Sequence, residues 1–471
     1  MTDLPQNWIE SELINIADLY TGNSINEKLK SEKYTNLSDG LNYIATKDIG
    51  YDNVINYNNG IKIPIGEQGF KVAPANSTLL CIEGGSAGRK IGYTKEEVCF
   101  VNKLCAFVSK LSAKNSKLIY YYLQSNEFKM QFSDKKNGLI GGVGVNKIKQ
   151  LKIKLPPMNE QKRIVKKLDS IMPKIDEVNE RLEKIPLILK RARQSILKQA
   201  ITGELTKDWR KGHSATWTTE SLINKINTEL SNLLLEKKIL KENSKISSEN
   251  IEKINDNNWY RIKARYLCHH ITKGTTPKKM TEIGDIPYLK VYNIVNNKID
   301  FEYKPQFVSN EIHNNFLARS KVYSDDVLMN IVGPPLGKIA IVPNSYAEWN
   351  INQAIAFFRP IKYLLSEYLY LTLCCESTLL DVLPDTKGIV GQSNIFLEQC
   401  RDLQILLPPV EEQTEIVKRV KEAFEKLDKI EEQYKKAKSY TDKLTQSILH
   451  KAFKGDLVPQ DPNDKPIKLS E

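Results

Sequence analysis

One stretch of 52 residues occurs twice in this chain, and this repeat constrains the fold more than any other feature. It runs from Leu155 to Thr206 and again from Leu407 to Val458, 252 residues later and without a gap. Both copies open with L-P-P-x-x-E-Q and close with Q-S-I-L-x-x-A-x-x-G-x-L, and 19 of the 52 aligned positions are identical. We therefore expect one long element to be used twice for the same purpose.

Apolar side chains recur in both copies at alternating steps of four and three residues. This spacing puts one apolar seam on each helix, as in helices that coil around a partner. Two matching seams in one chain most simply pair with each other. The predicted seam consists of Ile164, Leu168, Ile171, Ile175, Val178, Leu182, Ile185, Leu189, Ala192 and Ile196 in the first copy, and of Ile416, Val420, Ala423, Leu427, Ile430, Tyr434, Ala437, Thr441, Leu444 and Ile448 in the second.

The first of these helices should be a long spacer with an irregular course. A helix from residue 158 to 201 would be roughly 65 Å long, which is too long for one compact domain. Pro173 and Pro186 interrupt its pattern, whereas the second copy has Glu425 and Lys438 there. Because an interior proline removes a hydrogen bond, we expect the first helix to be bent or divided into two or three pieces.

The repeat extends into the segments that precede each helix. Short stretches rich in β-branched and aromatic residues, separated by Gly, Asn and Pro, predict mixed α and β domains. These domains differ far more from each other than the helices do, which suggests that each binds a different target. Matching segments are 43–49 with 288–294, 79–89 with 328–338, 101–107 with 351–357 and 116–132 with 366–382.

The repeat predicts an α+β chain of two tandem domains, two long helices, a connector and a tail. In the connector, residues 218–240 have helical spacing, whereas Lys241 to Asn258 is polar and predicts a flexible link. The tail after Pro459 should be extended or disordered. The predicted boundaries are 1–157 for the first domain, 158–206 for the first helix, 207–258 for the connector, 259–409 for the second domain, 410–458 for the second helix and 459–471 for the tail.

Composition favours a cytoplasmic protein. No apolar run approaches the roughly 18 residues that a membrane-spanning helix needs, and the N-terminus does not have the pattern of a signal peptide. The seven cysteines form no CxxC pair, which fits a reducing compartment. The net charge of +12 is compatible with a polyanionic partner but does not demonstrate one.

We find no catalytic or metal-binding motif. Residues 333–339 (GPPLGKI) have the wrong spacing for a phosphate-binding loop, and the glycines at 141–144 lack the context of a dinucleotide site. The consecutive Cys268, His269 and His270 do not suit tetrahedral zinc. The sequence also lacks the N-P-P-[YF] string of amino-methyltransferases. We predict no catalytic residue, no metal site and no cofactor bound by this chain.

Polar and basic residues lie at equivalent places in the two domains and suit contacts with phosphates and base edges. Their matched placement favours DNA binding, although each alone could be an ordinary loop residue. Tyr43 and Tyr288 are expected in the core. The candidates are Asn23, Ser24, Lys47, Ser86, Arg89, Lys90, Lys135, Lys136 and Asn137 in the first domain, and Lys273, Thr275, Thr276, Lys278, Lys290, Tyr292, Asn293, Lys338, Lys387, Gln392 and Asn394 in the second.

Two diverged domains, each followed by a helix with these opening and closing motifs, resemble the specificity subunit of type I restriction-modification systems. The resemblance rests on 155–161 with 194–205 and on 407–413 with 446–457. The segment 388–394 (GIVGQSN) also looks like the family's pattern, whereas 138–146 lacks its Gln.

The resemblance implies target recognition domains that read a split, asymmetric DNA site. It implies that the helices pair as an antiparallel coiled coil and bind two methyltransferase (M) subunits, which methylate adenine N6 with S-adenosylmethionine. Separate restriction (R) subunits would use ATP and Mg²⁺. The alternatives are a fused or solitary DNA-cleaving or DNA-methylating enzyme with paired DNA-binding domains, and a coiled-coil scaffold that binds protein alone.

Overall fold

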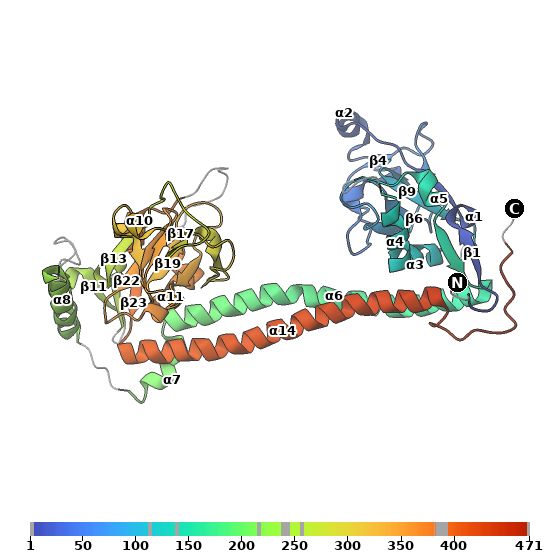
Figure 1. The fold of residues 1–471 in the computed structure, drawn as a ribbon. Helices are drawn as coiled ribbons and strands as arrows, with labels where there is room; N and C mark the ends of the chain where they lie inside the picture. Colours follow the sequence, from blue (N-terminus) through green and yellow to red (C-terminus); the bar gives the residue numbers. More distant parts are fainter. Residues whose placement is uncertain are drawn as a thin grey trace. The chain divides into compact units, whose positions relative to one another are not determined.

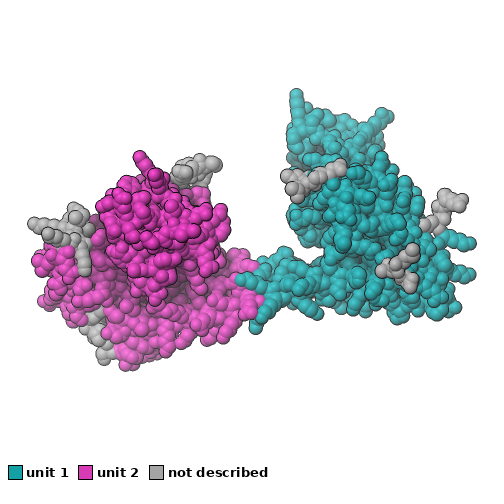
Figure 2. All heavy atoms as spheres, viewed as in Figure 1, with its two compact units in different colours: residues 1–185, 433–471 teal, residues 186–432 magenta. Residues whose placement is uncertain are grey.

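The computed structural model describes residues 4–111, 115–136, 141–213, 218–236, 245–254, 259–380, 382 and 394–468. Figure 1 shows its elements, and Figure 2 colours its two compact units. Unit 1 comprises residues 1–185 and 433–471, and unit 2 comprises residues 186–432. Each unit therefore contains one globular domain and one half of each long helix.

The globular domain of unit 1 is built from two four-stranded sheets and a two-stranded ribbon at its base. In the second of these sheets β3 runs parallel to β8, and the other pairings are antiparallel. The sheets are β2 (Ala17–Thr21), β9 (Leu104–Ser109), β6 (Thr78–Cys81) and β7 (Ile91–Tyr93); β4 (Lys62–Ile63), β3 (Leu41–Ile44), β8 (Val98–Phe100) and β5 (Val72–Ala73); and the ribbon β1 (Ile9–Glu12) with β10 (Lys152–Leu155). Helices α3 (Lys117–Gln124), α4 (Asn126–Asp134) and α5 (Val145–Lys149) follow the last strand of the first sheet.

The globular domain of unit 2 repeats the strand order of both four-stranded sheets, which confirms the predicted tandem repeat. Here too one pair, β14 with β21, is parallel. The sheets are β13 (Cys268–Lys273), β22 (Ile355–Pro360), β19 (Val327–Asn330) and β20 (Ile339–Ile341); and β17 (Phe307–Val308), β14 (Ile286–Leu289), β21 (Trp349–Ile351) and β18 (Lys321–Val322). The base ribbon is β12 (Trp259–Lys263) with β23 (Gln404–Leu407), and the helices are α11 (Ser366–Cys374), α12 (Glu376–Leu379) and α13 (Leu397–Asp402).

The same packing detail recurs in both domains. A Cβ at Gly22 would lie 1.8 Å from the carbonyl oxygen of Phe100, and one at Gly274 would lie 2.1 Å from that of Ile351, so only glycine fits at either place. The hydroxyl of Tyr43 donates to the carbonyl of Asn23 at 2.7 Å, as Tyr288 does to Thr275 at 2.9 Å. Both tyrosines are buried, which confirms their predicted core position.

The two long helices are unbroken. Helix α6 spans Met158–Ile201 and α14 spans Val410–Lys454. The prediction that prolines would divide the first helix into pieces is wrong. Pro173 and Pro186 both face solvent, where water can bond the carbonyl that each proline leaves without an amide partner.

The helices run antiparallel within each unit (Figure 1). In unit 1, Thr441 Oγ1 donates to Asn179 Oδ1 at 2.9 Å, and Ile164 shares a core cluster with Leu449. In unit 2, Arg193 Nη2 bonds Asp428 at 2.6 Å and Glu431 at 2.8 Å. In unit 1, residue numbers rise along α6 as they fall along α14. In unit 2, Arg193 bonds residues 428 and 431, whereas Ala200 shares a core cluster with Ile416, which gives the same direction. The predicted antiparallel coiled coil is therefore present.

Most predicted seam residues are buried or half-buried. The most deeply buried, Ile164, Leu168, Ile416 and Val420, lie in cores shared with a globular domain. Val178 and Ile430 remain 45% and 46% exposed, because two helices without further cover leave part of the seam open to solvent. The other large members, Ile171, Ile175, Leu182, Ile185, Leu189, Ile196, Leu427, Tyr434, Leu444 and Ile448, are buried or half-buried.

The connector is more ordered than predicted. Helix α8 (Thr219–Leu235) buries Leu222, Ile226 and Leu230 in the unit 2 core, as its spacing indicates. The prediction of a flexible link over Lys241 to Asn258 is wrong for residues 245–254. There a strand, β11 (Ile251–Ile254), pairs with β12 and adds a third strand to the base ribbon. The remaining residues of that segment lie outside the described ranges.

The described tail residues, 459–468, form neither helix nor strand; they include a turn from Asp461 to Asp464 and are bound to unit 1. The Arg163 guanidinium bonds Asp464 at 2.7 Å and holds the pKa of that carboxyl below its usual value. Asn159 and Asn7 also donate to Asp464. In the part of the chain that is described, no helix is long and apolar enough to span a bilayer.

Candidate nucleic-acid interface

The opening motif of each long helix bonds to the globular domain of the same unit. Trp8 Nε1 donates to Glu160 Oε2 at 3.0 Å, and Trp259 Nε1 donates to Glu412 Oε2 at 2.9 Å. Both carboxylates are buried, and so are the glutamines that follow them in the motif. The repeated L-P-P-x-x-E-Q motif is thus explained by buried hydrogen bonds that fix each domain at the start of a helix.

In unit 1 the structure gathers three predicted residues around an exposed tyrosine. Tyr51 is 60% exposed, and its hydroxyl lies 3.2 Å from Ser86 Oγ. Arg89 Cζ and Lys90 Nζ lie 5.0 and 5.2 Å from the centre of its ring. The loop between β6 and β7 supplies Ser86, Arg89 and Lys90, and a turn after β3 supplies Tyr51. We call these four residues the Tyr51 cluster.

The Tyr51 cluster is electropositive. Burial and the neighbouring Arg89 lower the pKa of Lys129, a residue of α4. Lys136 lies 5.9 Å from the ring centre of Phe132 at the end of the same helix. A ring face flanked by cations is suited to stacking on a base, and the cations are suited to phosphate oxygens.

The other candidates of the first domain are not part of the Tyr51 cluster, although Lys47 follows Thr46, whose carbonyl accepts from Lys90 at 3.0 Å. Ser24, Lys47 and Lys135 are exposed, and Asn23 is half-buried. Asn23 Oδ1 accepts from the Lys71 amide at 2.9 Å, and Ser24 donates to Asn102 at 2.6 Å. Asn137 lies outside the described residues.

Unit 2 has an aromatic and basic group in the corresponding region, built from different residues. Lys290 Nζ lies 5.9 Å from the ring centre of Tyr292, and Lys304 Nζ lies 5.3 Å from that of Tyr303. The two rings pack edge to face at 6.1 Å, and Tyr303 is 51% exposed. We call these four residues the Tyr303 cluster.

Asn293 has a structural position. It is buried, its Oδ1 accepts from the Lys290 amide, and its Nδ2 donates to the carbonyls of Asp300 and Tyr303. Asp48 has the same place in the first domain, where it accepts from the Ala45 amide at 2.8 Å. Both side chains hold the turn that supports the cluster beside it.

The remaining candidates of the second domain are spread over its loops. Lys273, Thr276, Lys278 and Asn394 are exposed, whereas Thr275 and Lys338 are half-buried. Lys387 and Gln392 lie outside the described residues.

Sequence reasoning missed Tyr51, Tyr303 and Lys304. A signal for Tyr303 and Lys304 was their place in a polar segment between two predicted strands, but nothing in the repeat pointed to Tyr51.

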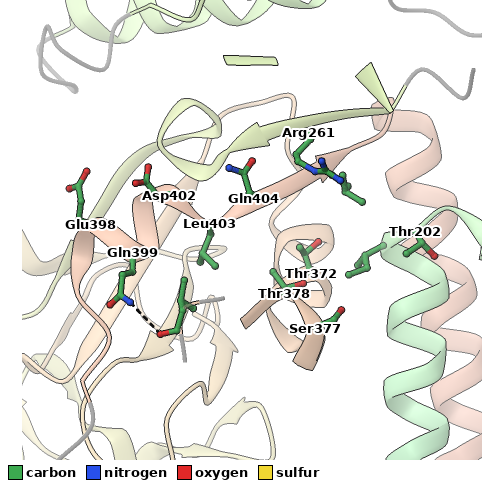
Figure 3. Close-up of a pocket in the computed structure, with 13 residues that line it drawn as sticks. Thr202, Arg261, Thr372, Ser377, Thr378, Glu398, Gln399, Asp402, Leu403 and Gln404 are labelled. Atoms are coloured by element: carbon green, nitrogen blue, oxygen red, sulfur yellow. Dashed lines mark hydrogen bonds between the residues drawn. The ribbon is translucent and has the colours of Figure 1, made fainter. Parts of the chain in front are cut away.

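A pocket of about 490 Å³ in unit 2 is separate from the Tyr303 cluster (Figure 3). The end of α6, strands β12 and β23, and helices α11 to α13 surround it, with Thr202, Arg261, Thr372 and Gln404 in its lining. Its two acidic residues, Glu398 and Asp402, both pair with Arg265. Among the described residues, no three His, Cys, Asp or Glu side chains come together as a metal site requires.

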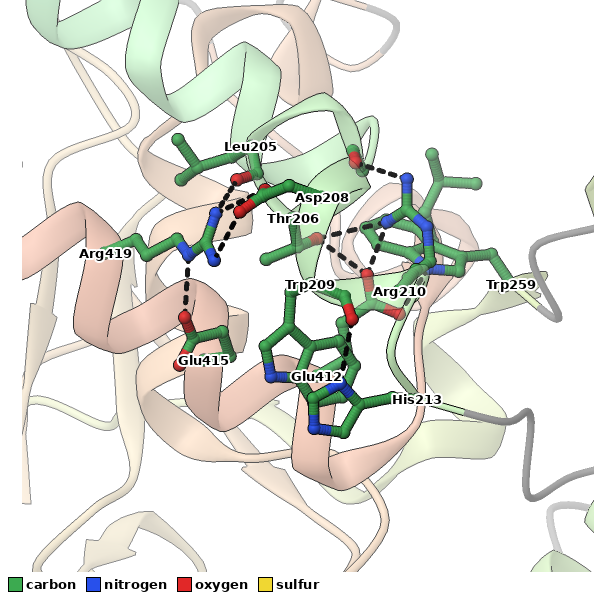
Figure 4. A network of polar contacts seen from close by, with 12 residues as sticks. Leu205, Thr206, Asp208, Trp209, Arg210, His213, Trp259, Glu412, Glu415 and Arg419 are labelled. Carbon is green, nitrogen blue, oxygen red and sulfur yellow. Dashed lines mark hydrogen bonds and ion pairs between the residues drawn. The ribbon is translucent and has the colours of Figure 1, made fainter.

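The first residues of the connector bind the start of α14 in unit 2 (Figure 4). Thr206 Oγ1 donates to Glu412 Oε1 at 2.6 Å, and the Arg210 guanidinium pairs with the same oxygen. Arg419 bonds both carboxylate oxygens of Asp208, at 2.6 and 3.0 Å, and holds the pKa of Asp208 at about 2. Glu412 thus accepts hydrogen bonds from Thr206, Arg210 and Trp259, which lie in three different segments.

The fold defines a protein with two globular domains of one topology on a shared helix pair. The family model described as "Type I restriction modification DNA specificity domain" matches residues 5–187 and 256–438, and the chain belongs to this family. It is a DNA specificity subunit of a type I restriction-modification system, as the sequence motifs predicted. The alternative of a nuclease or methyltransferase with its own active site is not supported.

Relatives match over nearly the whole chain. The "Type I restriction enzyme EcoBI specificity subunit" of Escherichia coli is 27% identical, over 100% of this chain and 90% of its own length. The EcoKI specificity subunit of E. coli strain K12 is 24% identical, over 99% of this chain and 93% of its own. A solved chain from a study of complex assembly in the type I R-M system has the same fold, with a TM-score of 0.62, 17% identity and coverage of 97% of this chain and 100% of its own.

Proposed function

We propose that each globular domain reads one half of a bipartite, asymmetric DNA site. The observation that carries this proposal is the contrast between scaffold and surface. The two domains have the same strand order and the same parallel strand pair, yet one presents the Tyr51 cluster and the other the Tyr303 cluster. A common scaffold with different surface chemistry suits two readers of different sequences.

We further propose that this chain acts without an active site of its own. Two methyltransferase (M) subunits bind the helix pair, and restriction (R) subunits join through them. S-adenosylmethionine, ATP and Mg²⁺ serve those partners, in the cytoplasm. The exposed apolar side chains of Val178 and Tyr440 in unit 1, and of Leu187 and Ile188 in unit 2, support this proposal because they leave helix surface to be covered.

The test is a binding titration with the full chain and its matching methyltransferase subunit. Duplexes that carry the methylated motif of the host and duplexes with either half scrambled are compared at several salt concentrations. We expect the intact site to bind about a thousandfold or more tightly than a scrambled one, with affinity that falls steeply with salt. Equal affinity for every duplex would contradict the proposal.

A further inference from the structure

The closing motif of each long helix carries a glutamine that bonds to a globular domain. In unit 2, Gln194 Nε2 donates to the carbonyl of Cys374 at 3.1 Å, and Gln194 Oε1 accepts from the Glu376 amide at 2.9 Å. Because α11 ends at Cys374 and α12 begins at Glu376, one side chain satisfies both helix ends.

Unit 1 contains the matching contact in a weaker form. Gln446 Nε2 donates to the carbonyl of Gln124, the last residue of α3, at 3.2 Å. Gln446 Oε1 is buried, and none of the described residues donates a hydrogen bond to it. The two glutamines occupy equivalent places in the repeat, but Gln194 makes two bonds and Gln446 makes one.

The helix ends that these glutamines hold also contact the segments that carry the two clusters. In unit 1, Asn53 Nδ2 donates to Gln124 Oε1 at 3.2 Å, two residues beyond Tyr51. In unit 2, Tyr370 OH, one helical turn before Cys374, donates to the carbonyl of Asn297 at 3.1 Å. Asn297 lies in the turn between β15 (Ile294–Val295) and β16 (Lys298–Ile299), within the segment that joins Tyr292 to Tyr303. A short series of hydrogen bonds thus links the long helices to the segments that carry the Tyr51 and Tyr303 clusters.

We propose that Gln194 and Gln446 are positioning residues that fix the angle at which each recognition domain stands on the helix pair, and so limit which spacings between half-sites are accepted. This inference rests on the proposed function. Neither glutamine lies in the Tyr51 or the Tyr303 cluster. Their loss should therefore leave the base preference of each half-site unchanged and relax only the spacing.

The experiment uses the full chain expressed with its methyltransferase subunits and a plasmid library of target sites. The library varies the spacer by one and two base pairs in both directions and varies each base of the half-sites. The variants are Gln194→Met and Gln446→Met, which keep the side-chain length and remove the amide. Gln199→Ala on α6 and Gln433→Ala on α14 are the matched controls, since both of these glutamines are exposed.

The measured quantity is methylation at spacers one base pair longer or shorter than native, divided by methylation at the native spacer. We expect both Met variants to raise this ratio by about three- to tenfold over the wild type, the range that the loss of one or two net hydrogen bonds supports. Gln194→Met should have the larger effect because it removes two bonds. The base preferences of both half-sites should not change, and the control variants should match the wild type.

Several results would overturn the inference while leaving the proposed function intact. One is an unchanged spacer preference in both Met variants. Another is a proportional loss of methylation at every spacer, which would mean that the glutamines contribute to stability alone. If the wild-type complex methylated no bipartite motif, the proposed function itself would fail, and the inference with it.

Discussion

Replacing Arg210 with Met should destabilise unit 2 by about 3 kcal/mol at neutral pH. The Glu412 carboxylate is buried and accepts from Trp259 Nε1, and Arg210 is the cation that neutralises it (Figure 4). Arg210 Nη2 also donates to the Gly203 carbonyl at 2.6 Å. Removal of Arg210 therefore leaves a buried negative charge and a carbonyl that has lost a donor.

The magnitude follows from the donors that remain. Breaking a buried ion pair by removing one partner costs about 3 to 5 kcal/mol. Thr206 Oγ1 and Trp259 Nε1 would still donate to Glu412, which places the cost at the lower end of that range. In a Glu412→Gln background no buried charge remains, so Arg210→Met should then cost only about 1 kcal/mol.

The assay is hydrogen exchange resolved by peptide, on the full chain, with urea unfolding of the same samples. Peptides from 259–263 and 404–417 in unit 2 should lose protection in Arg210→Met, whereas unit 1 peptides should not. Lys211→Met is the matched control, because Lys211 is the next residue and faces solvent. A cost below about 1 kcal/mol, or no rescue by Glu412→Gln, would refute the reasoning.

Three further predictions concern the same two units. Burial raises the pKa of Glu160 despite the nearby Arg163, and Glu160 forms no ion pair within the described ranges. The ionised carboxylate therefore weakens the fold at pH values above the raised pKa. Glu160→Gln should leave unit 1 as stable or more stable near neutral pH, with a gain that disappears in acid, as pH-dependent urea unfolding would show. A loss of stability at neutral pH would contradict this. Leu449→Ala should cost unit 1 about 2 to 5 kcal/mol, because Leu449 is fully buried in the unit 1 core; exchange protection that falls equally in unit 2 would count against it. Arg89→Ala should lower the slope of log affinity against log salt by about one if Arg89 contacts a phosphate; an unchanged slope would remove Arg89 from the interface.

Much of the architecture could be predicted because the chain repeats itself. A gapless 252-residue offset indicates two copies of one unit, and the heptad spacing predicts the helix pair. Tyr43 and Tyr288 are matched aromatic residues within strand-like segments, and both proved to be core. These features depend on local patterns, which a sequence displays directly.

The features that sequence reasoning missed depend on distant contacts. Tyr51 acquires its role only because the loop at 86–90 folds against it. Gln194 and Gln446 are visible as repeated residues, but the partner of Gln194 lies 180 residues away, on α11. The segment 245–254 looks polar, yet Ile251 is buried in a strand that pairs with β12, and the buried Ile246 bonds through its backbone to Asn227 on α8. In each case the deciding neighbour comes from another part of the chain.

The most direct test of the account is single-molecule sequencing of modified adenines in genomic DNA from the host strain, with and without this gene. We predict that one bipartite motif, two short half-sites separated by a spacer of fixed length, is methylated in the wild type and loses modification when the gene is deleted. Restoration of the gene should restore the motif. Modification that is unchanged on deletion, or loss of a continuous motif with no spacer, would contradict the central claim.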